Sequence, residues 1–248
     1  MKQNIYDEDT FYQEYKTMRE SGTSYNDFIE QPALRAALGD PGGKDILDLG
    51  CGAGAFAYYC AANKAKSVRG IDISSNMINQ ARMTNHHENI IYEQSSMEDC
   101  QLPAAGFDMA VSSLAMHYIK NYSSIVEKTH TALRHGGIFI FTMEHPYATA
   151  RRGMGKWIKD KKGNKLYWAL DNYQEEGKRE QHWVIDGVIK YHRTISSLMN
   201  TLIASGFLIE EVQEPKPTAE GLEKQPKLCS ELRKPSFLLI KSRKKGES

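Results

Sequence analysis

The sequence has few cysteines, no long apolar run and almost no net charge. Its four cysteines, Cys51, Cys60, Cys100 and Cys229, form no C-x-x-C pair, so we expect reduced thiols and neither a metal site nor a redox pair. No window approaches the roughly 20 apolar residues that a membrane-spanning helix needs. The formal net charge of +1 provides no global field that would attract nucleic acid or an anionic membrane.

The length and composition are those of an ordinary soluble globular protein. The chain has 248 residues, of which 40% are apolar and 25% are charged, and this length suits one α/β domain with a modest insertion. The N-terminus lacks the apolar stretch of a signal peptide, which together with the reduced thiols predicts a cytoplasmic location. We therefore expect a single domain over residues 1–248, as a monomer or a homodimer, without membrane attachment.

Short apolar runs alternate with helical stretches from residue 45 onward. The runs predict strands at 45–49, 67–73, 90–94, 107–112, 138–143, 207–212 and 236–241. Helices are expected at 33–38, 55–64, 74–85, 122–134 and 194–204. Strands that alternate with helices require crossover connections, so the fold class is α/β with a doubly wound, mostly parallel sheet.

Two segments break this alternation. Residues 1–40 are polar and aromatic, and the spacing of Tyr15 and Arg19 places them on one helix face. Residues 144–192 combine aromatic and charged side chains with little apolar periodicity. We expect the first segment to form a helical lid and the second an inserted cap over the mouth of the sheet. Residues 214–234 are expected to be a loop.

A glycine-rich turn, DLGCGAG at residues 48–54, follows the first predicted strand. Glycine lacks a Cβ and tolerates positive φ, so this backbone can approach a ligand closely, and the next helix points its N-terminal amides at the same place. Asp72 ends the following strand, where a carboxylate can accept hydrogen bonds from both hydroxyls of a ribose. The turn contains both G-x-G-x-G and G-x-G-x-x-A, so it predicts a nucleoside cofactor without deciding between S-adenosylmethionine and NAD.

Five segments in order resemble motifs of the class I S-adenosylmethionine-dependent methyltransferases, and within them the small-molecule enzymes of the ubiquinone and menaquinone biosynthesis type. The turn at 48–54 is similar to the first motif of that family. Four further segments are similar to the later motifs of that family: GIDISSNM at 70–77, SSMED at 95–99 with LP at 102–103, FDMAVSSLAMH at 107–117 and LRHGG at 133–137. The resemblance implies a Rossmann-like sheet of seven strands in which the last strand is antiparallel.

The resemblance also implies S-adenosylmethionine as the cofactor. An acid in the second motif would hold the ribose, and the residues after it would flank the adenine. The implied cofactor residues are Asp48, Gly50, Cys51, Gly52, Gly54, Asp72, Ile73, Met77, Ser96, Met97, Glu98 and Ser113. The family often has an acid where Ser96 stands, so adenine would be recognised by the weaker Ser96 hydroxyl or by backbone atoms of Met97.

Tyr15 and Arg19 are further candidate contacts, from the N-terminal lid. An arginine suits a carboxylate, so this pair could reach the amino-acid end of the cofactor or the methyl acceptor. The alternative is that the two side chains belong to a solvated amphipathic helix.

Methyl transfer from a sulfonium is an in-line displacement, which needs a base only when the acceptor is a hydroxyl or a carbon acid. Three histidines follow strand ends or close the insertion, near the edge where open α/β sheets bind ligands: His117, His145 and His192. Each is a candidate base. Each also has a structural alternative, as a packed side chain, a hydrogen-bonded loop residue or part of a helix start.

The insertion is rich in cations and aromatic rings. Its cations could bind RNA or an anionic substrate, but acids follow closely, which favours a solvated lid. Its rings could line an acceptor pocket or form a small core of the insertion. The cations are Arg151, Arg152, Lys156, Lys159, Lys161, Lys162 and Lys165, and the rings are those of Trp157, Tyr167, Trp168, Tyr173 and Trp183.

These observations together predict a methyltransferase that acts on a small molecule. A short-chain nicotinamide oxidoreductase needs Tyr-x-x-x-Lys after the middle strands, but the match at Tyr12 and Lys16 precedes the glycine turn. An adenine-specific nucleic-acid methyltransferase carries Asn/Asp-Pro-Pro-aromatic after the fourth strand, where this chain has SSLA at 112–115. An RNA methyltransferase and a non-catalytic S-adenosylmethionine-binding protein are the alternatives, because binding and catalysis share the same motifs.

Overall fold

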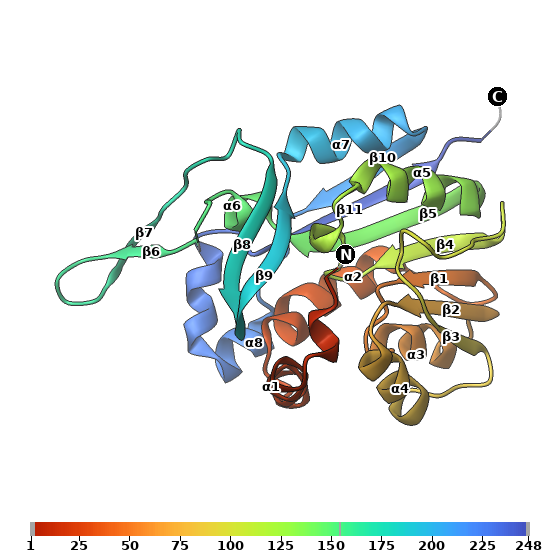
Figure 1. Ribbon diagram of the computed structural model, residues 1–248, viewed down its shortest axis with the longest axis horizontal. Helices are drawn as coiled ribbons and strands as arrows, with labels where there is room; N and C mark the ends of the chain where they lie inside the picture. Colours follow the sequence, from red (N-terminus) through yellow and green to blue (C-terminus); the bar gives the residue numbers. More distant parts are fainter. Residues whose placement is uncertain (1–2, 154, 247–248) are drawn as a thin grey trace.

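The computed structural model describes residues 3–153 and 155–246, and it is built around a sheet of seven strands (Figure 1). The strand order is β10-β11-β5-β4-β1-β2-β3. The strands are β1 (Asp45–Leu49), β2 (Ser67–Asp72), β3 (Ile90–Gln94), β4 (Phe107–Ser112), β5 (Leu133–Glu144), β10 (Phe207–Gln213) and β11 (Phe237–Lys244).

One strand of this sheet runs against the others. β11 lies between β5 and β10 and pairs antiparallel with both, whereas the remaining neighbours are parallel. The expected seven-stranded sheet with an antiparallel last strand is therefore confirmed. Since parallel strands end at the same edge, Gly50 after β1, Asp72 of β2, Ser113 after β4 and Glu144 of β5 are brought to one side of the molecule.

Helices cover both faces of the sheet. One face carries α2 (Gln31–Leu38), α3 (Ala55–Ala62) and α4 (Ser75–Thr84), and the other carries α5 (Tyr122–Ala132) and α7 (Ile195–Ala204). The central strand β1 is buried on both sides, because Ile46 packs in the first layer and Leu47 in the second. Burial on both faces explains why this strand is a continuous apolar run in the sequence.

Polar caps and a glycine fix several helix ends. The hydroxyl of Ser74 accepts a hydrogen bond from the amide of Met77 at the start of α4, and Thr194 caps α7 in the same way through Ser197. Gly206, with a φ of +90°, follows α7. In the described part of the chain, no helix combines the length and the apolar character that crossing a membrane requires.

Several predicted boundaries differ from the structure by one to five residues, and two predictions differ most. The helix expected to reach residue 134 ends earlier, because Leu133 is already extended and starts β5. The segment 214–234, expected to be a loop, contains α8 (Ala219–Lys224) and the 3₁₀ helix η4 (Pro226–Leu232). The hydroxyl of Thr218 caps α8 by accepting a hydrogen bond from the amide of Gly221. A threonine at this position is a typical helix start, which could have indicated α8 from the sequence.

The N-terminal segment is helical and lies beside the ligand-binding edge of the sheet (Figure 1). It forms the 3₁₀ turn η1 (Ile5–Asp7), α1 (Asp9–Glu20) and the π-helix η2 (Asn26–Glu30). The buried ring of Phe11 lies 5.3 Å from that of Trp183, so this segment packs directly on the insertion.

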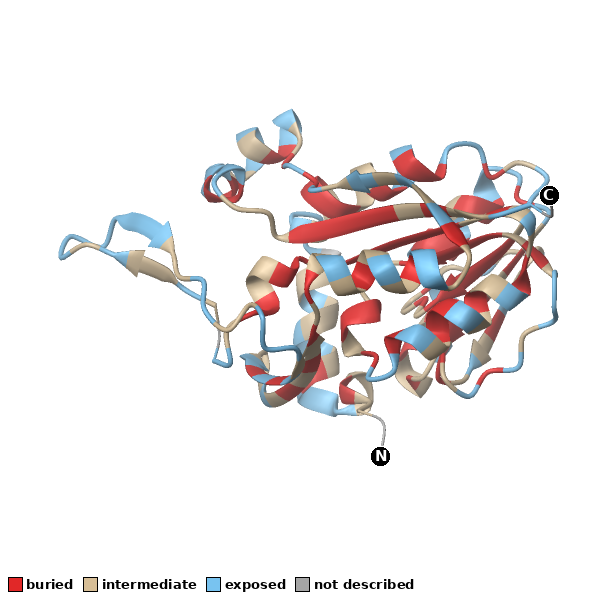
Figure 2. Ribbon diagram, turned by 90° about the horizontal axis from the view of Figure 1, so that it is seen from above, coloured by how far each residue is buried: buried red, intermediate tan, exposed pale blue. Residues whose placement is uncertain are grey.

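The insertion contains regular structure that the sequence did not predict. After the short helix α6 (Pro146–Thr149), β6 (Trp157–Lys159) pairs with β7 (Lys165–Trp168), and β8 (Gly177–Trp183) pairs with β9 (Ile185–His192). The β6–β7 hairpin projects away from the body of the molecule, and many of its residues are exposed (Figure 2). The β8–β9 hairpin instead packs against the N-terminal segment.

Candidate functional site

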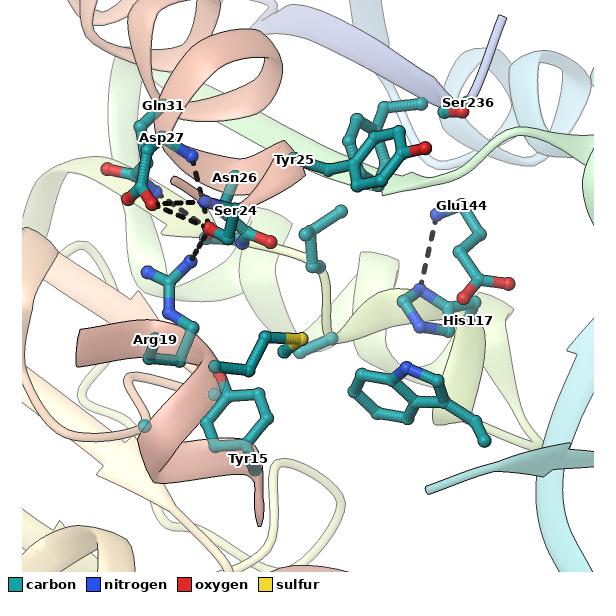
Figure 3. Close-up of a pocket in the computed structure, with 18 of the residues that line it drawn as sticks. Tyr15, Arg19, Ser24, Tyr25, Asn26, Asp27, Gln31, His117, Glu144 and Ser236 are labelled. Atoms are coloured by element: carbon teal, nitrogen blue, oxygen red, sulfur yellow. Dashed lines mark hydrogen bonds between the residues drawn. The ribbon is translucent and has the colours of Figure 1, made fainter. Parts of the chain in front are cut away.

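A cavity of about 1410 Å³ opens along the edge where the parallel strands end. Its walls come from the turns after β1 and β4, the ends of β2 and β5, the N-terminal helices and the insertion. Figure 3 shows Tyr15 and Arg19 on one side of this cavity and His117 and Glu144 on the other. Pockets for one ligand usually have about 300–1,000 Å³, so two molecules can lie here side by side.

The glycine turn after β1 has a backbone that glycine adopts with little strain. Gly50, Gly52 and Gly54 have φ values of +76°, +52° and +81°. A Cβ on Gly50 would lie 2.5 Å from the Cβ of Ala115, and one on Gly54 would clash with Tyr92. A Cβ on Gly52 would meet no described atom within 4 Å, because Gly52 lines the cavity. The turn therefore forms a cradle beside Gly52 that a ligand can fill.

Asp72 ends β2 next to this turn and lines the cavity. Its Oδ2 accepts the amide of Gly52 at 2.9 Å, and its Oδ1 accepts the amide of Ser74 at 2.9 Å. Burial raises the pKa of Asp72, although these two amides oppose that effect. Each oxygen of a carboxylate can accept more than one hydrogen bond, so Asp72 keeps capacity for ligand hydroxyls.

Asp48 is an isolated buried acid on the same wall. It is 1% exposed and lines the cavity, and neither of its carboxylate oxygens has a hydrogen-bond partner among the described residues. Burial raises the pKa of Asp48 to about 7, and the charges of Asp72 and Glu30 add to the effect. A buried carboxylate without a partner is costly. Its position therefore fits a cationic group of a ligand.

A second buried acid, Glu30, organises the wall between the N-terminal segment and β4. Its Oε1 accepts hydrogen bonds from the hydroxyl of Ser113 at 2.9 Å and from that of Thr142. Its Oε2 accepts a hydrogen bond from the side-chain amide of Gln31 at 2.8 Å. Burial raises the pKa of Glu30. The Ser113 hydroxyl is thus already used in a hydrogen bond to the protein, while Ser113 still lines the cavity.

Tyr15 and Arg19 of α1 form part of the cavity wall on the N-terminal side (Figure 3). Nη1 of Arg19 donates to Oγ of Ser24 at 3.4 Å, and that hydroxyl in turn donates to Asp27 at 2.7 Å. Burial raises the pKa of Tyr15, which keeps the phenol protonated. The structure thus places both candidates beside the cavity.

The expected cofactor residues fall into two groups. The cavity is lined by Tyr15, Arg19, Asp48, Gly50, Cys51, Gly52, Asp72, Met77 and Ser113. The described cavity wall does not include Gly54, Ile73, Ser96, Met97 and Glu98.

The turn at 95–99 is held by contacts within the protein, which explains why the structure does not bring it to the cavity. The hydroxyl of Ser96 donates to Oδ2 of Asp99 at 2.8 Å. Nζ of Lys128 donates to the carbonyl oxygen of Met97 at 3.0 Å and also to that of Glu98.

Of the three candidate histidines, His117 alone lines the cavity. The residue is buried, and its Nδ1 accepts the backbone amide of Glu144 at 3.4 Å (Figure 3). When Nδ1 accepts, the neutral ring carries its proton on Nε2. Burial lowers the pKa of His117 to about 4. At neutral pH the ring therefore offers an N–H donor, whereas a general base needs a basic lone pair at that atom.

His145 and His192 are buried with both ring nitrogens engaged, so their surroundings are those of structural residues. Nδ1 of His145 accepts an amide of α6 at 3.0 Å, and its Nε2 lies 3.0 Å from Oε1 of Glu214. Nδ1 of His192 lies 2.9 Å from the hydroxyl of Thr149, and its Nε2 lies 2.9 Å from the carbonyl oxygen of Tyr173. Neither histidine belongs to the described cavity wall. Within residues 3–153 and 155–246, no group of three or more His, Cys, Asp or Glu side chains could hold a metal ion.

The sequence left open whether the aromatic rings of the insertion line an acceptor pocket or form a small core, and the structure divides them between cavity-lining and other positions. Trp157, Trp168 and Trp183 line the cavity. Tyr167 is 60% exposed, and the hydroxyl of Tyr173 accepts the amide at the start of α7. The tryptophans therefore face the cavity, while the tyrosines do not.

Three charged residues of this site escaped the sequence analysis. Glu30 follows the apolar pair Phe28 and Ile29, and a charge inside an apolar run was the available signal. Lys190 and Lys234 also line the cavity, but each belongs to a segment that the sequence analysis did not resolve into elements. Nothing in their local sequence distinguishes them from surface lysines.

Comparisons with known proteins agree with this geometry. A sequence profile of the methyltransferase domain matches residues 47–141. An uncharacterized protein from Haemophilus influenzae is 33% identical over 98% of each chain. The crystal structure of an S-adenosylmethionine-dependent methyltransferase from Mesorhizobium loti is 40% identical, covers 87% of this chain and 97% of its own, and superposes with a TM-score of 0.81. A fatty-acid O-methyltransferase from Mycolicibacterium smegmatis is 29% identical over 45% of this chain and 41% of its own.

Proposed function

The chain belongs to the S-adenosylmethionine-dependent methyltransferases, and from that premise we propose that it methylates a small molecule bound beside the cofactor in the cavity. The protein is an enzyme, and S-adenosylmethionine is its cofactor. The observation that carries the proposal is the unpartnered carboxylate of Asp48 on the cavity wall. S-adenosylmethionine is a nucleoside with cationic ammonium and sulfonium groups, and such a carboxylate fits a cation better than it fits the anionic diphosphate of NAD.

The residues around the glycine turn fit this cofactor. Asp48 would hold the ammonium of its amino-acid part, and Asp72 would accept hydrogen bonds from the ribose hydroxyls. The open space at Gly52 lets the chain of the cofactor pass close to the backbone. Arg19, on the opposite wall, suits the carboxylate of the amino-acid part.

When bound, S-adenosylmethionine supplies a methyl group on a sulfonium, which a nucleophile can displace in line. The chain's own task is to hold the acceptor on that line and to exclude water. The tryptophans of the insertion and the aromatic rings of the N-terminal segment close the far end of the cavity. Nε2–H of His117 would donate to the acceptor and orient it, with its tautomer fixed by the amide of Glu144.

A small acceptor is supported by the shape of the site. The second half of the cavity is bounded by side chains of the insertion and of the segment before β11, so it suits a molecule of limited size. The fatty-acid O-methyltransferase among the relatives is named for a small acceptor. The cations of the insertion give less support to RNA, because Arg152 is paired with Glu175 at 2.8 Å.

Calorimetry with S-adenosylhomocysteine and with NAD tests the cofactor half of the proposal. We expect binding of the first and none of the second, and tight NAD binding without S-adenosylhomocysteine binding would overturn it. Single-turnover reactions with methyl-labelled cofactor and a cell extract test the acceptor. Label in the low-mass fraction is expected. Label only in RNA would replace the small-molecule acceptor, and transfer to neither fraction would favour a binding protein.

A further inference from the structure

Two lysines are buried in the wall of the cavity. The side chain of Lys190, on β9, is 4% exposed, and that of Lys234, between η4 and β11, is 8% exposed. Lysine is among the residue types least often buried, and burial of its charge needs compensation. Lys190 lies 2.5 Å from Oε1 of Glu144, and Lys234 lies 2.6 Å from Oε2 of Glu231.

The two ion pairs belong to one charged cluster. Burial alone would raise the pKa of Glu144, but the charge of Lys190, and more weakly that of Lys234, holds it below its ordinary value. Both lysines therefore act on the same carboxylate, although they are far apart in the sequence. Glu144 is therefore ionised at neutral pH.

The cluster has more donors than the protein uses. An ammonium carries three N–H groups. Lys190 donates to Glu144, and Lys234 donates to Glu231 and to Ser236 at 3.0 Å, so each ammonium keeps at least one N–H group that no described oxygen accepts. Lys190 also lies 5.3 Å from the ring centre of Trp183, and Lys234 lies 4.6 Å from that of Trp168. Lys165 and Lys227 also line the cavity.

Two neutral donors nearby also lack partners. Trp168 and Gln181 line the same cavity, and their buried atoms Nε1 and Nε2 have no hydrogen-bond partner among the described residues. Buried polar groups in folded proteins are nearly always hydrogen-bonded, so unpartnered donors in the wall of a cavity point to a ligand with acceptor atoms. The indole nitrogen can only donate, which fixes the polarity of its partner.

Resting on the proposed methyl transfer, we infer that the acceptor is a small carboxylic acid, whose carboxylate is held by Lys190 and Lys234 with a hydrogen bond from Trp168. A carboxylate supplies the acceptor atoms that these donors lack. A phosphate dianion fits less well, because Glu144 and Glu231 would repel its second charge. Leu114 and Phe237 line the cavity as well, so the body of the acid is apolar.

Calorimetry on the full chain saturated with S-adenosylhomocysteine tests this inference. The probes are matched pairs of an acid and its amide: benzoate and benzamide, 2-naphthoate and 2-naphthamide, octanoate and octanamide. We expect at least one acid to bind about tenfold or more tightly than its amide. If no acid in the panel is preferred, or if 2-naphthyl phosphate binds more tightly than every acid, the inference is wrong.

Variants separate recognition from folding. Lys190→Met and Lys234→Met should each weaken binding of the preferred acid about tenfold and leave its amide unchanged, and Trp168→Phe should weaken the acid less. The matched control is Lys159→Met on the exposed hairpin. Because Lys190→Met leaves Glu144 without its partner, the double variant Lys190→Met/Glu144→Gln keeps the cluster balanced, and unchanged acid affinity in it would refute the role of Lys190. Failure of S-adenosylhomocysteine to bind the wild-type protein would instead count against the proposed function.

Discussion

The carboxylate of Asp7 accepts a hydrogen bond from the hydroxyl of Ser74 at 2.6 Å and thereby joins the N-terminal segment to the helix after the Asp72 strand. The amides of Ser75 and Asn76 donate to the same carboxylate at 3.2 Å and 3.0 Å. An acid at this place also complements the positive end of the helix dipole of α4. The link couples the position of α1 to the wall that we propose holds the cofactor.

Replacing Asp7 should release this link. Asp7→Ala is expected to lower the free energy of unfolding by about 1–2 kcal/mol, the usual range for loss of a helix cap. Burial alone would raise the pKa of Asp7, but the hydrogen bonds from Ser74, Asn76 and Ser75 lower it to about 2. The contribution is therefore complete above the unfolded-state pKa near 4 and disappears as the pH falls from about 4 to 2.

Urea unfolding at pH 7 and at pH 2.5 checks this prediction. The wild-type protein and Asp7→Ala should differ at pH 7 and should converge at the lower pH. Glu88→Ala, at an exposed position before β3, is the control and should behave like the wild type at both pH values. A difference that persists undiminished at low pH would show that Asp7 acts through packing.

A second prediction concerns closure of the cavity. Residues 5–38 and 144–192 both contribute to its wall, and Phe11 packs on Trp183 where the two segments meet. Binding of S-adenosylhomocysteine should therefore slow amide hydrogen exchange in both segments, because a ligand stabilises the closed arrangement against local opening. Exchange in β10, remote from the cavity, should not change. Unaltered exchange in both segments at saturating ligand would argue against a lid.

The sheet was predictable because its strands repeat one pattern. Strands buried on both faces are apolar runs, and the turns after them carry glycine, proline or a capping residue. The bounds of β1, β3 and β4 were predicted to the residue. The cofactor side of the site followed from the same regularity, since the ends of parallel strands must meet at one edge.

The insertion was not predictable by that pattern, because its buried positions are polar. In β8, Arg179 and Gln181 point inward while their neighbours are exposed. Nε of Arg179 donates to the carbonyl oxygen of Ala150 at 2.9 Å, so hydrogen bonds take the place of apolar packing. A hydropathy pattern therefore predicts irregular structure for such a strand, and it predicts that Lys190 is exposed.

Removing the donor at position 117 should affect turnover and leave cofactor binding intact. Loss of one hydrogen bond to the acceptor is worth about 1–1.5 kcal/mol, so His117→Ala should lower turnover about tenfold. Because the wild-type ring is neutral and donates, the pH–rate profile of the wild type should have no limb near pH 6.5 that titrates a histidine base. His117→Gln, whose amide can also donate, should retain more activity than His117→Ala.

The stability of His117→Gln, compared with that of the wild type, provides an independent measurement. Burial lowers the pKa of His117 to about 4 from its usual 6.5, so the neutral ring favours folding above pH 6.5 and this contribution is lost as the pH falls towards 4. The wild-type protein should therefore lose stability between pH 6.5 and 4 more steeply than His117→Gln. A rate profile that follows a group of pKa near 6.5, present in the wild type and absent from His117→Gln, would restore the base assignment.

Asp72 should be required for cofactor affinity and dispensable for folding. An ionised carboxylate that accepts a hydroxyl contributes roughly 1.5–3 kcal/mol per charge-assisted bond. Asp72→Asn and Asp72→Ala should therefore both weaken S-adenosylhomocysteine binding at least about tenfold, as measured by calorimetry. Asp186→Asn, at the exposed start of β9, is the matched control. Wild-type affinity in a folded Asp72→Ala protein would show that the ribose lies elsewhere.

The buried charge of Asp48 should make the protein less stable when no cofactor is bound. Because that charge lacks a partner in the protein, it should also strengthen cofactor binding. Its folded-state pKa of about 7 lies above the unfolded value near 4, so the destabilisation develops as the pH rises from about 4 to 7 and is complete above 7. Asp48→Asn should therefore be more stable than the wild type at pH 8, by on the order of 2–4 kcal/mol, and no different at pH 4.

Cofactor binding should show the opposite effect of the same substitution. If the carboxylate holds the ammonium of the cofactor, affinity for S-adenosylhomocysteine should rise as Asp48 ionises through pH 7 and fall again at higher pH, where the ligand's own ammonium loses its proton. In Asp48→Asn the rise in affinity around pH 7 should be absent, and S-adenosylhomocysteine should bind at least about tenfold more weakly at pH 7.5. Thermal unfolding and calorimetry over pH 4–9 measure both effects, with the exposed Asp171→Asn as control. An Asp48→Asn protein that is stabilised at pH 8 yet keeps wild-type affinity would mean that Asp48 is buried for packing alone.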